Sequence, residues 1–155
     1  MRMKILSKSL LITILLILFP FQSKAEEINS SEKYYIVISN QNHFTGQMDQ
    51  RALRGFFTLK RTVWPNGHAV QIITLNTDSS KHRRFIEDEL KLFNYQVKRI
   101  WDRQIFSGSA LTPIEVNDFE ELIRKITSTP GSIGYIAQSY IQAVKNESIT
   151  LIAVK

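Results

Sequence analysis

The sequence predicts an α/β fold in which helices flank a central mixed sheet. Short runs rich in β-branched and aromatic residues occur near the start, the middle and the end of the chain. Longer segments with apolar residues at helical spacing separate these runs. No internal repeat and no low-complexity tract divides the chain after the first 25 residues, so one domain is expected there.

The first 25 residues have the pattern of a secretory signal peptide. A basic start precedes a run from Leu10 to Phe19 in which only Thr13 is polar, and Ser23 and Ala25 suit cleavage by a signal peptidase. A membrane span needs roughly 20 apolar residues, so a retained anchor is the less favoured interpretation. We therefore expect a periplasmic protein whose domain covers residues 26–155, with no membrane span after cleavage.

Composition excludes several kinds of partner and site. The chain has no cysteine, which excludes disulfides, thiolate metal sites and a lipid-modified cysteine. Four of the 20 Lys and Arg residues lie in the leader, which leaves 16 against 14 Asp and Glu and reduces the net charge from +6 to +2. A domain so nearly balanced is a poor candidate for nucleic-acid binding, and we expect no nucleic-acid partner.

The first part of the domain alternates strands with one helix. A β-branched and aromatic run predicts a largely buried strand at 34–39, and a second such run predicts a strand at 70–75. Asp49 is a suitable N-cap for a short helix between them. The apolar positions of that helix, at i, i+3 and i+4 spacing, are Leu53, Phe56 and Phe57.

Three helices are predicted after the second strand. Asp78, Ser79 and Ser80 all suit the N-cap of a helix over 81–93, and Asn94 marks a break before the next helix. The apolar residues of this second helix are Val97, Ile100, Trp101 and Ile105. A loop over 107–113 leads to the third helix, for which Asn117 and Glu120 form a capping-box pattern and whose apolar face is Phe119, Leu122, Ile123 and Ile126.

The chain is predicted to end with strands at 133–136 and 149–154, with a helical segment between them. Pro130-Gly131 is a turn dipeptide, and Gly134 lies inside the first of these strands. A glycine within a strand indicates a bend or the close approach of another backbone. Trp64 and Trp101 are interpreted as core anchors because large aromatic side chains bury much surface.

Two segments resemble the phosphate family of periplasmic solute-binding proteins. Residues 129–135, TPGSIGY, resemble the TPGAIGY-type segment of that family. Residues 56–60 and 64–67, FFTLK and WPNG, resemble its F-x-G-K…W-P-x-G segment. The resemblance covers roughly Tyr34 to Ile136. It implies one lobe of a two-lobed, type 2 periplasmic binding protein, linked to phosphate uptake or sensing through an ABC transporter or a sensor protein in the membrane.

The candidate binding site is the segment that joins the second strand to the following helix. The first N–H groups of a helix have no internal partner, and the helix dipole favours an anion there. Ser hydroxyls could add donors, and four basic residues follow: Lys81, His82, Arg83 and Arg84. The alternative is simple N-capping followed by a solvated basic turn, because any Ser-capped helix shows this pattern.

The resemblance adds a residue pattern at this segment. Phosphate-binding proteins of this type carry an R-x-D-G-S-G-T-like sequence, in which Asp78 would match the Asp and Ser80 the Ser. Asn76 stands in place of the Arg and His82 in place of the Thr, so the bidentate cation is missing unless Arg83 replaces it. The implied anion-binding residues are Asn76, Asp78, Ser79, Ser80, His82 and Arg83.

The function expected from these observations is non-enzymatic binding of phosphate or a similar oxyanion. No G-x-S-x-G motif surrounds Ser79 and Ser80, so no catalytic set is indicated and no cofactor is implied. The histidines, His43, His68 and His82, lack metal-ligand spacing and are interpreted as surface or loop residues. The alternative is a lobe-like protein-interaction module of a sensor or transporter in which ligand binding is lost. That alternative predicts an exposed apolar patch.

Overall fold

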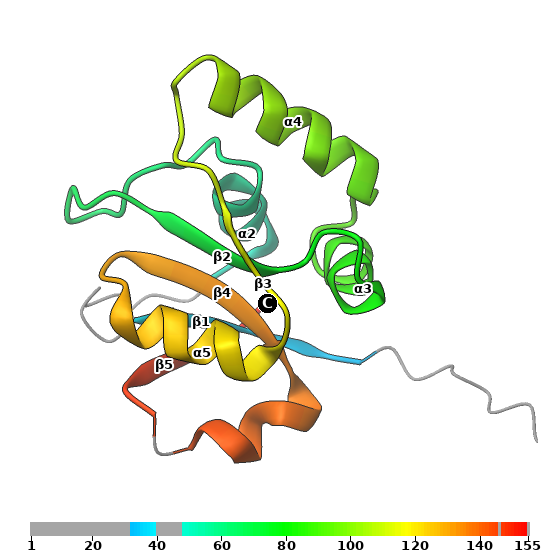
Figure 1. Cartoon of the computed structure of the whole chain (residues 1–155), viewed down its shortest axis with the longest axis vertical. Coiled ribbons are helices and arrows are strands. Elements are labelled where there is room, and N and C mark those ends of the chain that lie inside the picture. The colour runs from blue at the N-terminus through cyan, green and yellow to red at the C-terminus, as the bar shows by residue number, and fades with distance from the viewer. Residues whose placement is uncertain (1–31, 40–47, 146, 155) are drawn as a thin grey trace, which may run out of the picture. The chain divides into compact units, whose positions relative to one another are not determined.

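The computed structural model describes residues 32–39, 48–145 and 147–154 (Figure 1). The predicted signal peptide and His43 lie outside the described residues. The strands are β1 (Tyr34–Ser39), β2 (Gln71–Leu75), β3 (Ile114–Val116), β4 (Ser132–Ala137) and β5 (Ile149–Ala153). The helices are α2 (Gln50–Phe57), α3 (Ser80–Asp88), α4 (Asn94–Phe106), α5 (Phe119–Ser128) and the 3₁₀ helix η2 (Gln138–Val144).

The strands form one mixed sheet in the order β3-β2-β4-β1-β5. β2 pairs in parallel with both β3 and β4, whereas β1 runs antiparallel to β4 and β5. All six residues of β4 are buried, as expected for a strand near the centre of a sheet that is covered on both faces. The predicted α/β class with a central mixed sheet is confirmed.

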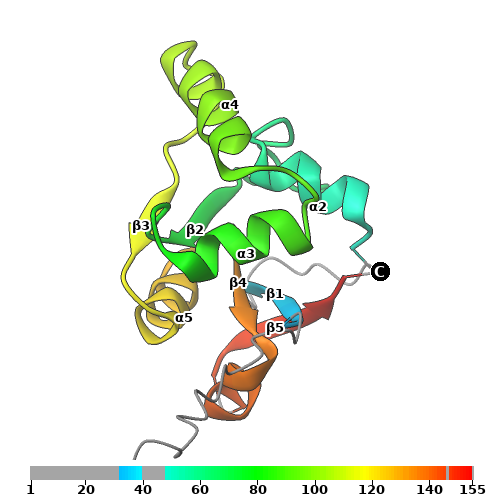
Figure 2. The same ribbon diagram turned by 90° about the vertical axis from the view of Figure 1, so that its right-hand side faces the viewer.

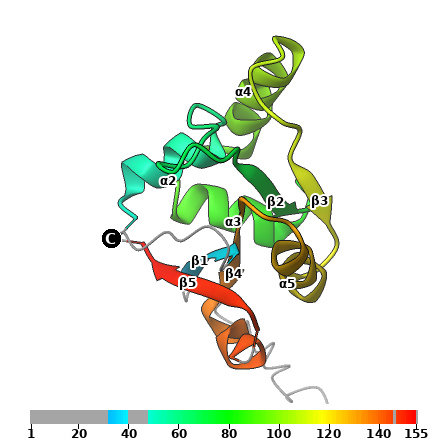
Figure 3. The same cartoon turned by 90° about the vertical axis from the view of Figure 1, so that its left-hand side faces the viewer.

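Consecutive residues of β4 show how the helices cover the two faces. A Cβ added to Gly134 would lie 2.8 Å from Ile126 Cδ1, so α5 packs tightly against this face. Tyr135 points to the other face, where it stacks on Phe85 of α3 at 3.7 Å between ring centroids and meets Phe57 of α2 edge-on. Figures 2 and 3 accordingly show α5 on one side of the sheet and α2 on the other.

Two tryptophans tie the connections to this core, as the sequence predicted. Trp64 is buried in the segment after α2 and donates a hydrogen bond from Nε1 to Gly131 O at 2.8 Å. Trp101 of α4 is also buried and donates from Nε1 to Phe57 O at 2.7 Å. α4 therefore joins the fold through its contacts with α2 and α3, at the outside of the layers (Figure 1).

The turn before β4 requires its glycine. Gly131 has φ +78°, and a Cβ there would sit 2.4 Å from Ala69 O, so both the backbone conformation and the space exclude a side chain. The Pro130-Gly131 turn and the close approach at Gly134 predicted from the sequence are confirmed. Gly131 and Gly134 are therefore required by the fold, through the turn and the close packing around β4.

Several element boundaries differ from the prediction. The edge strand β3 was not predicted, because a three-residue strand is too short to show a period of two. α3 ends at Asp88 and not near residue 93, and the carbonyls of Glu89 and Leu90 beyond it accept hydrogen bonds from the side chains of Gln50 and Arg54. The helical segment before β5 is the 3₁₀ helix η2.

The cap of α5 also differs by one residue from the predicted pair of Asn117 and Glu120. Asp118 is the N-cap, and its carboxylate accepts a hydrogen bond from Glu121 N–H at 2.8 Å. Glu121 in turn accepts from the backbone N–H of Asn117. The caps proposed for the other helices are confirmed: Asp49 caps α2, and Ser79 is the one of the three candidates that caps α3.

In the part of the chain that the structure describes, no helix combines the length and the apolar character needed to cross a membrane.

Candidate functional site

The junction between β2 and α3, residues 76–79, is a turn held largely by its own atoms. Asn76 Oδ1 accepts a hydrogen bond from Asp78 N–H, and Asn76 O accepts from Ser79 N–H, both at 2.9 Å. Ser79 Oγ accepts from His82 N–H at 3.1 Å, which is the N-cap interaction. The polar residues that suggested an anion site therefore first build the turn that starts the helix.

A carboxylate of the protein already binds this turn. Glu115 of β3 accepts from Thr77 N–H at 3.1 Å, and the Thr77 hydroxyl lies 3.4 Å from its other oxygen. Asn94 Nδ2 donates to Thr77 O at 2.8 Å. The Thr77 N–H group, a backbone donor that could face an external oxyanion, is thus occupied by a carboxylate of the protein. This contact could not be predicted from the sequence, because β3 was not predicted.

The donors that remain lie at the first turn of α3. The backbone N–H groups of Ser80 and Lys81 have no hydrogen-bond partner within the described residues. Both side chains are exposed, as is that of Arg83 one turn later. These groups form a small, solvent-facing positive end of a nine-residue helix, the kind of position that favours an anion.

Acidic and basic side chains around the junction partly offset each other. The exposed carboxylate of Asp78 lies 3.5 Å from Lys98 Nζ of α4. Lys81 Nζ lies over the ring of Phe119, 5.2 Å from its centroid. With Asp78 and Glu115 both close to the turn, the basic residues that follow do not create a strongly positive site.

The position predicted for His82 is wrong. The sequence suggested a surface or loop histidine that adds charge to the site, but its side chain is 0% exposed. Its Nδ1 lies 2.9 Å from both Thr74 Oγ1 and Tyr135 OH. Its spacing to Phe85 and Ile86 was the missed signal, because residues at i, i+3 and i+4 share one helix face and that face is buried.

Burial determines the charge state of His82. Loss of solvation lowers its pKa from 6.5 to about 4, and the side chain of Asn94 opposes this shift without cancelling it. Burial likewise raises the pKa of Tyr135. His82 Nε2 and Asn94 Oδ1 are buried and lack a partner at hydrogen-bond distance among the described atoms. At neutral pH His82 is therefore an uncharged residue of the core.

The structure consequently divides the predicted site into two parts. One part is at the surface, where Asn76 and Asp78 of the turn and Ser80 and Arg83 of α3 are exposed and Ser79 is half-buried. His82 lies beneath that turn and links it to β2 and β4 through Thr74 and Tyr135. Within the described ranges no group of three or more His, Asp or Glu side chains could hold a metal ion.

The arrangement of the strands and helices matches parts of solved phosphate-binding proteins. PstS from Borrelia burgdorferi aligns with a TM-score of 0.61 at 18% identity over 80% of this chain and 47% of its own. An ABC-type phosphate transport receptor from Vibrio cholerae aligns with a TM-score of 0.58 at 16% identity, over 79% of this chain and 46% of its own. The fold is that of one lobe of such proteins.

A third match contains the ligand. A putative phosphate ABC transporter substrate-binding protein with bound phosphate from Clostridium perfringens gives a TM-score of 0.57 at 15% identity, over 79% of this chain and 45% of its own. The present chain thus spans slightly less than half the length of these proteins. No family model matches the sequence, and no curated protein is significantly similar to it in sequence. The similarity of fold confirms the single-lobe resemblance.

Proposed function

We propose that this domain is a non-enzymatic, periplasmic oxyanion-binding protein that binds phosphate at the start of α3. The observation that carries the proposal is the pair of unpartnered N–H groups of Ser80 and Lys81 at an exposed helix N-terminus. Such groups point toward a bound anion, and the helix dipole adds to their attraction. The fold shared with phosphate-binding proteins makes phosphate the first ligand to test.

The side chains of the turn and of the first turn of α3 have separate roles in this proposal. The Ser80 hydroxyl and the Asn76 amide group donate hydrogen bonds, and Arg83 supplies positive charge. The Ser79 hydroxyl donates its proton to the ligand while its oxygen continues to cap His82 N–H. Asp78 repels a fully ionised phosphate and accepts a hydrogen bond from a protonated one. The ring of His82 cannot reach a ligand, because it is buried. Its role is to support the turn from beneath.

A site on one lobe is open to solvent, so binding is expected to be weak. Two-lobed binding proteins enclose their ligand by closing about a hinge, and this chain spans about half of the aligned proteins. Millimolar affinity would suit a sensor of abundant phosphate, or a lobe that is completed by a transporter or sensor protein in the membrane. The signal-peptide pattern of residues 1–25 is the basis for proposing a periplasmic localisation.

Substitution of Ser80 by proline tests this proposal directly. Proline is well tolerated at the first position of a helix, and Ser79 has the extended backbone that the residue before proline prefers. Ser80→Pro therefore removes one free N–H and the hydroxyl without breaking α3, whereas Ser80→Ala removes the hydroxyl alone. Isothermal titration of residues 26–155 with phosphate should give heat that Ser80→Pro reduces more than Ser80→Ala.

Two outcomes contradict phosphate binding at this helix. One is no heat with millimolar phosphate. The other is an unchanged affinity in Ser80→Pro, which would place the anion elsewhere on the protein. Titration with sulfate serves as the comparison, because sulfate carries no proton for Asp78 to accept and should bind more weakly than phosphate.

The second candidate function is the protein-interaction module. Exposed aromatic side chains on and beside α4 favour it: Phe93 and Tyr95 stack at 5.8 Å while more than half exposed, and Phe106 is 90% exposed. Exposed aromatic clusters are typical of contact surfaces. The test is cross-linking in the envelope of the wild-type chain and of a Phe93→Ser, Phe106→Ser variant. A monomer that yields the same cross-links in both would contradict this function.

A further inference from the structure

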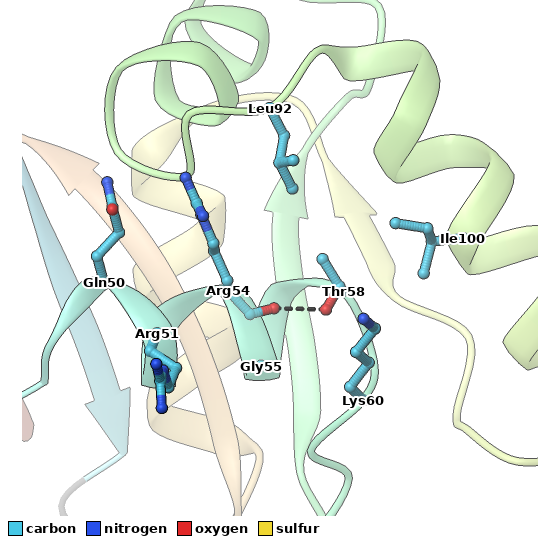
Figure 4. Close-up of a pocket in the computed structure, with 8 residues that line it drawn as sticks. All are labelled: Gln50, Arg51, Arg54, Gly55, Thr58, Lys60, Leu92 and Ile100. Carbon is cyan, nitrogen blue, oxygen red and sulfur yellow. Dashed lines mark hydrogen bonds between the residues drawn. The ribbon is translucent and has the colours of Figure 1, made fainter.

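A hollow of about 640 Å³ lies between α2, the segment that follows it, and α4. Its polar lining is Gln50, Arg51, Arg54, Thr58 and Lys60, and its other lining residues are Gly55, Leu92 and Ile100 (Figure 4). None of residues 76–83 contributes to it. The hollow is therefore separate from the start of α3.

The charge of this hollow has one sign. Arg51, Arg54 and Lys60 line it, and no lining residue is acidic. The ion pairs found among the described residues involve Lys98 and Arg124, so none of these three cations forms an ion pair with a described carboxylate. Unpaired charges of one sign around a concave surface raise the local concentration of ions of the opposite sign.

Part of this charge is held in place by the end of α3. Arg54 Nε donates to Leu90 O, and Gln50 Nε2 donates to Glu89 O at 3.2 Å. The other guanidinium N–H groups of Arg54 have no partner within the described part of the chain. Thr58 Oγ1 donates to Arg54 O at 2.6 Å, which fixes the position of its hydroxyl oxygen in the lining of the hollow. A positioned cation loses less side-chain entropy when it binds a ligand.

The opposite wall is apolar. Leu92, from the segment between α3 and α4, and Ile100, from α4, face Arg54 and Lys60 across the hollow (Figure 4). Sites for small organic ligands commonly have volumes of roughly 300 to 1,000 Å³, with apolar walls and a few convergent polar groups. The size and the two-sided lining suit an organic anion better than an isolated inorganic oxyanion.

We propose that this hollow binds a small organic anion: a phosphate monoester, sulfonate or carboxylate attached to an apolar group. The charged group lies between Arg54 and Lys60, where Arg51 adds positive potential. The apolar group packs against Leu92 and Ile100. This site is independent of the phosphate site proposed at α3, and the two can be tested separately.

Phenyl phosphate is the probe, because it joins a dianion to an apolar ring. Isothermal titration of residues 26–155 should show that it binds more tightly than inorganic phosphate. Lys60→Gln should weaken phenyl phosphate about tenfold, as expected for loss of one charge-assisted contact. Arg51→Gln should weaken it about threefold. Both side chains are exposed and form no hydrogen bond or ion pair with the described residues, so these variants should fold.

Lys125→Gln is the matched control. Lys125 is an exposed cation on α5, which covers the other face of the sheet. Its loss should leave the affinity for phenyl phosphate unchanged within about twofold, since a distant exposed charge is screened by salt. Equal weakening by Lys60→Gln and Lys125→Gln would mean diffuse attraction by the whole surface and would overturn the proposal, as would the absence of binding.

Ser80→Pro separates this proposal from the proposed function. Binding of phenyl phosphate at the hollow predicts that Ser80→Pro leaves its affinity unchanged while Lys60→Gln lowers it. Weakening of phenyl phosphate by Ser80→Pro but not by Lys60→Gln would place the ligand at α3 and overturn the proposed hollow site. If inorganic phosphate does not bind but phenyl phosphate still binds and depends on Lys60, only the function proposed at α3 is contradicted.

Discussion

The turn at residues 76–79 and the hollow beside α2 are both positions where an anion could bind. They differ in whether their polar groups are already hydrogen-bonded within the protein. In the turn, the donors are largely occupied by other groups of the protein, including the carboxylate of Glu115. In the hollow, the side chains of Arg51 and Lys60 form no hydrogen bond or ion pair with the described residues. The turn uses its polar residues to build structure, whereas the hollow leaves its charges available.

This difference shows that residue types alone do not identify a binding site. The side chains of Asn76, Ser79 and His82 are chemically suited to bind an anion, yet each is already hydrogen-bonded to another group of the protein. A group that is already hydrogen-bonded gains little from a ligand, because the new bond replaces an existing one. The number of unsatisfied groups is therefore the better measure of each region's capacity to bind.

The largest effect is expected from His82→Ala, which tests whether the turn is mainly structural. The change leaves a cavity and removes the partner of Thr74 and Tyr135 in the core. We expect a loss of about 4 kcal/mol in the free energy of unfolding, measured by urea denaturation at pH 7. The exposed His68→Ala is the control and should cost less than about 0.5 kcal/mol. Similar effects of the two changes would contradict a structural role for His82.

The pH dependence of stability gives the next largest effect. The unfolded chain takes up a proton on His82 near pH 6.5, but the folded protein does so only near pH 4. The stabilisation from neutral His82 is thus complete above pH 6.5 and is lost as the pH falls toward 4. The shift corresponds to about 3 kcal/mol. The nearby charges of Lys98 and Asp78 act in opposite directions and change this little.

The measurement is urea denaturation of the wild-type chain and of His82→Ala between pH 7 and pH 4. The difference in stability between the two should narrow by about 3 kcal/mol over this range, because the variant has no imidazole to protonate. A difference that stays constant with pH would show that His82 is not the group responsible.

The sequence predicted the fold well because the fold depends on features that are local in sequence. Buried runs such as residues 34–39 and 132–137 and the caps Asp49 and Ser79 are visible in short windows. The turn at Gly131 is equally local. These features specify strands, helix starts and the turn regardless of what lies across the sheet.

The sites were less predictable because they depend on contacts between distant segments. Glu115 reaches Thr77 only because β3 lies beside β2, and β3 is too short to be predicted. The hollow combines residues 50–60 with Leu92 and Ile100, which only the packing of α4 brings together. Which polar group is satisfied, and which charge is left unpaired, is decided by this tertiary packing.

A smaller effect is expected from Glu115→Ala, which would make the turn more like the hollow. The change frees Thr77 N–H and removes a negative charge beside the turn. We expect a loss of about 1 kcal/mol in stability and, on the proposed function, about fivefold tighter binding of phosphate. Glu120→Ala on the exposed face of α5 is the control. Weaker phosphate binding in Glu115→Ala would mean that Glu115 orders the site and does not compete with the ligand.

The smallest effect is expected from Lys60→Gln in the absence of any ligand. A charge with no described partner adds little to the folded state, so the free energy of unfolding should change by less than about 0.5 kcal/mol. Arg54→Gln should cost about 1 to 2 kcal/mol, because Arg54 binds Leu90 O at the end of α3. Urea denaturation of both variants measures the contrast. If Lys60→Gln lowered the free energy of unfolding as much as Arg54→Gln, Lys60 would stabilise the fold, as the polar groups of the turn do. The proposed difference between the two regions would then be wrong.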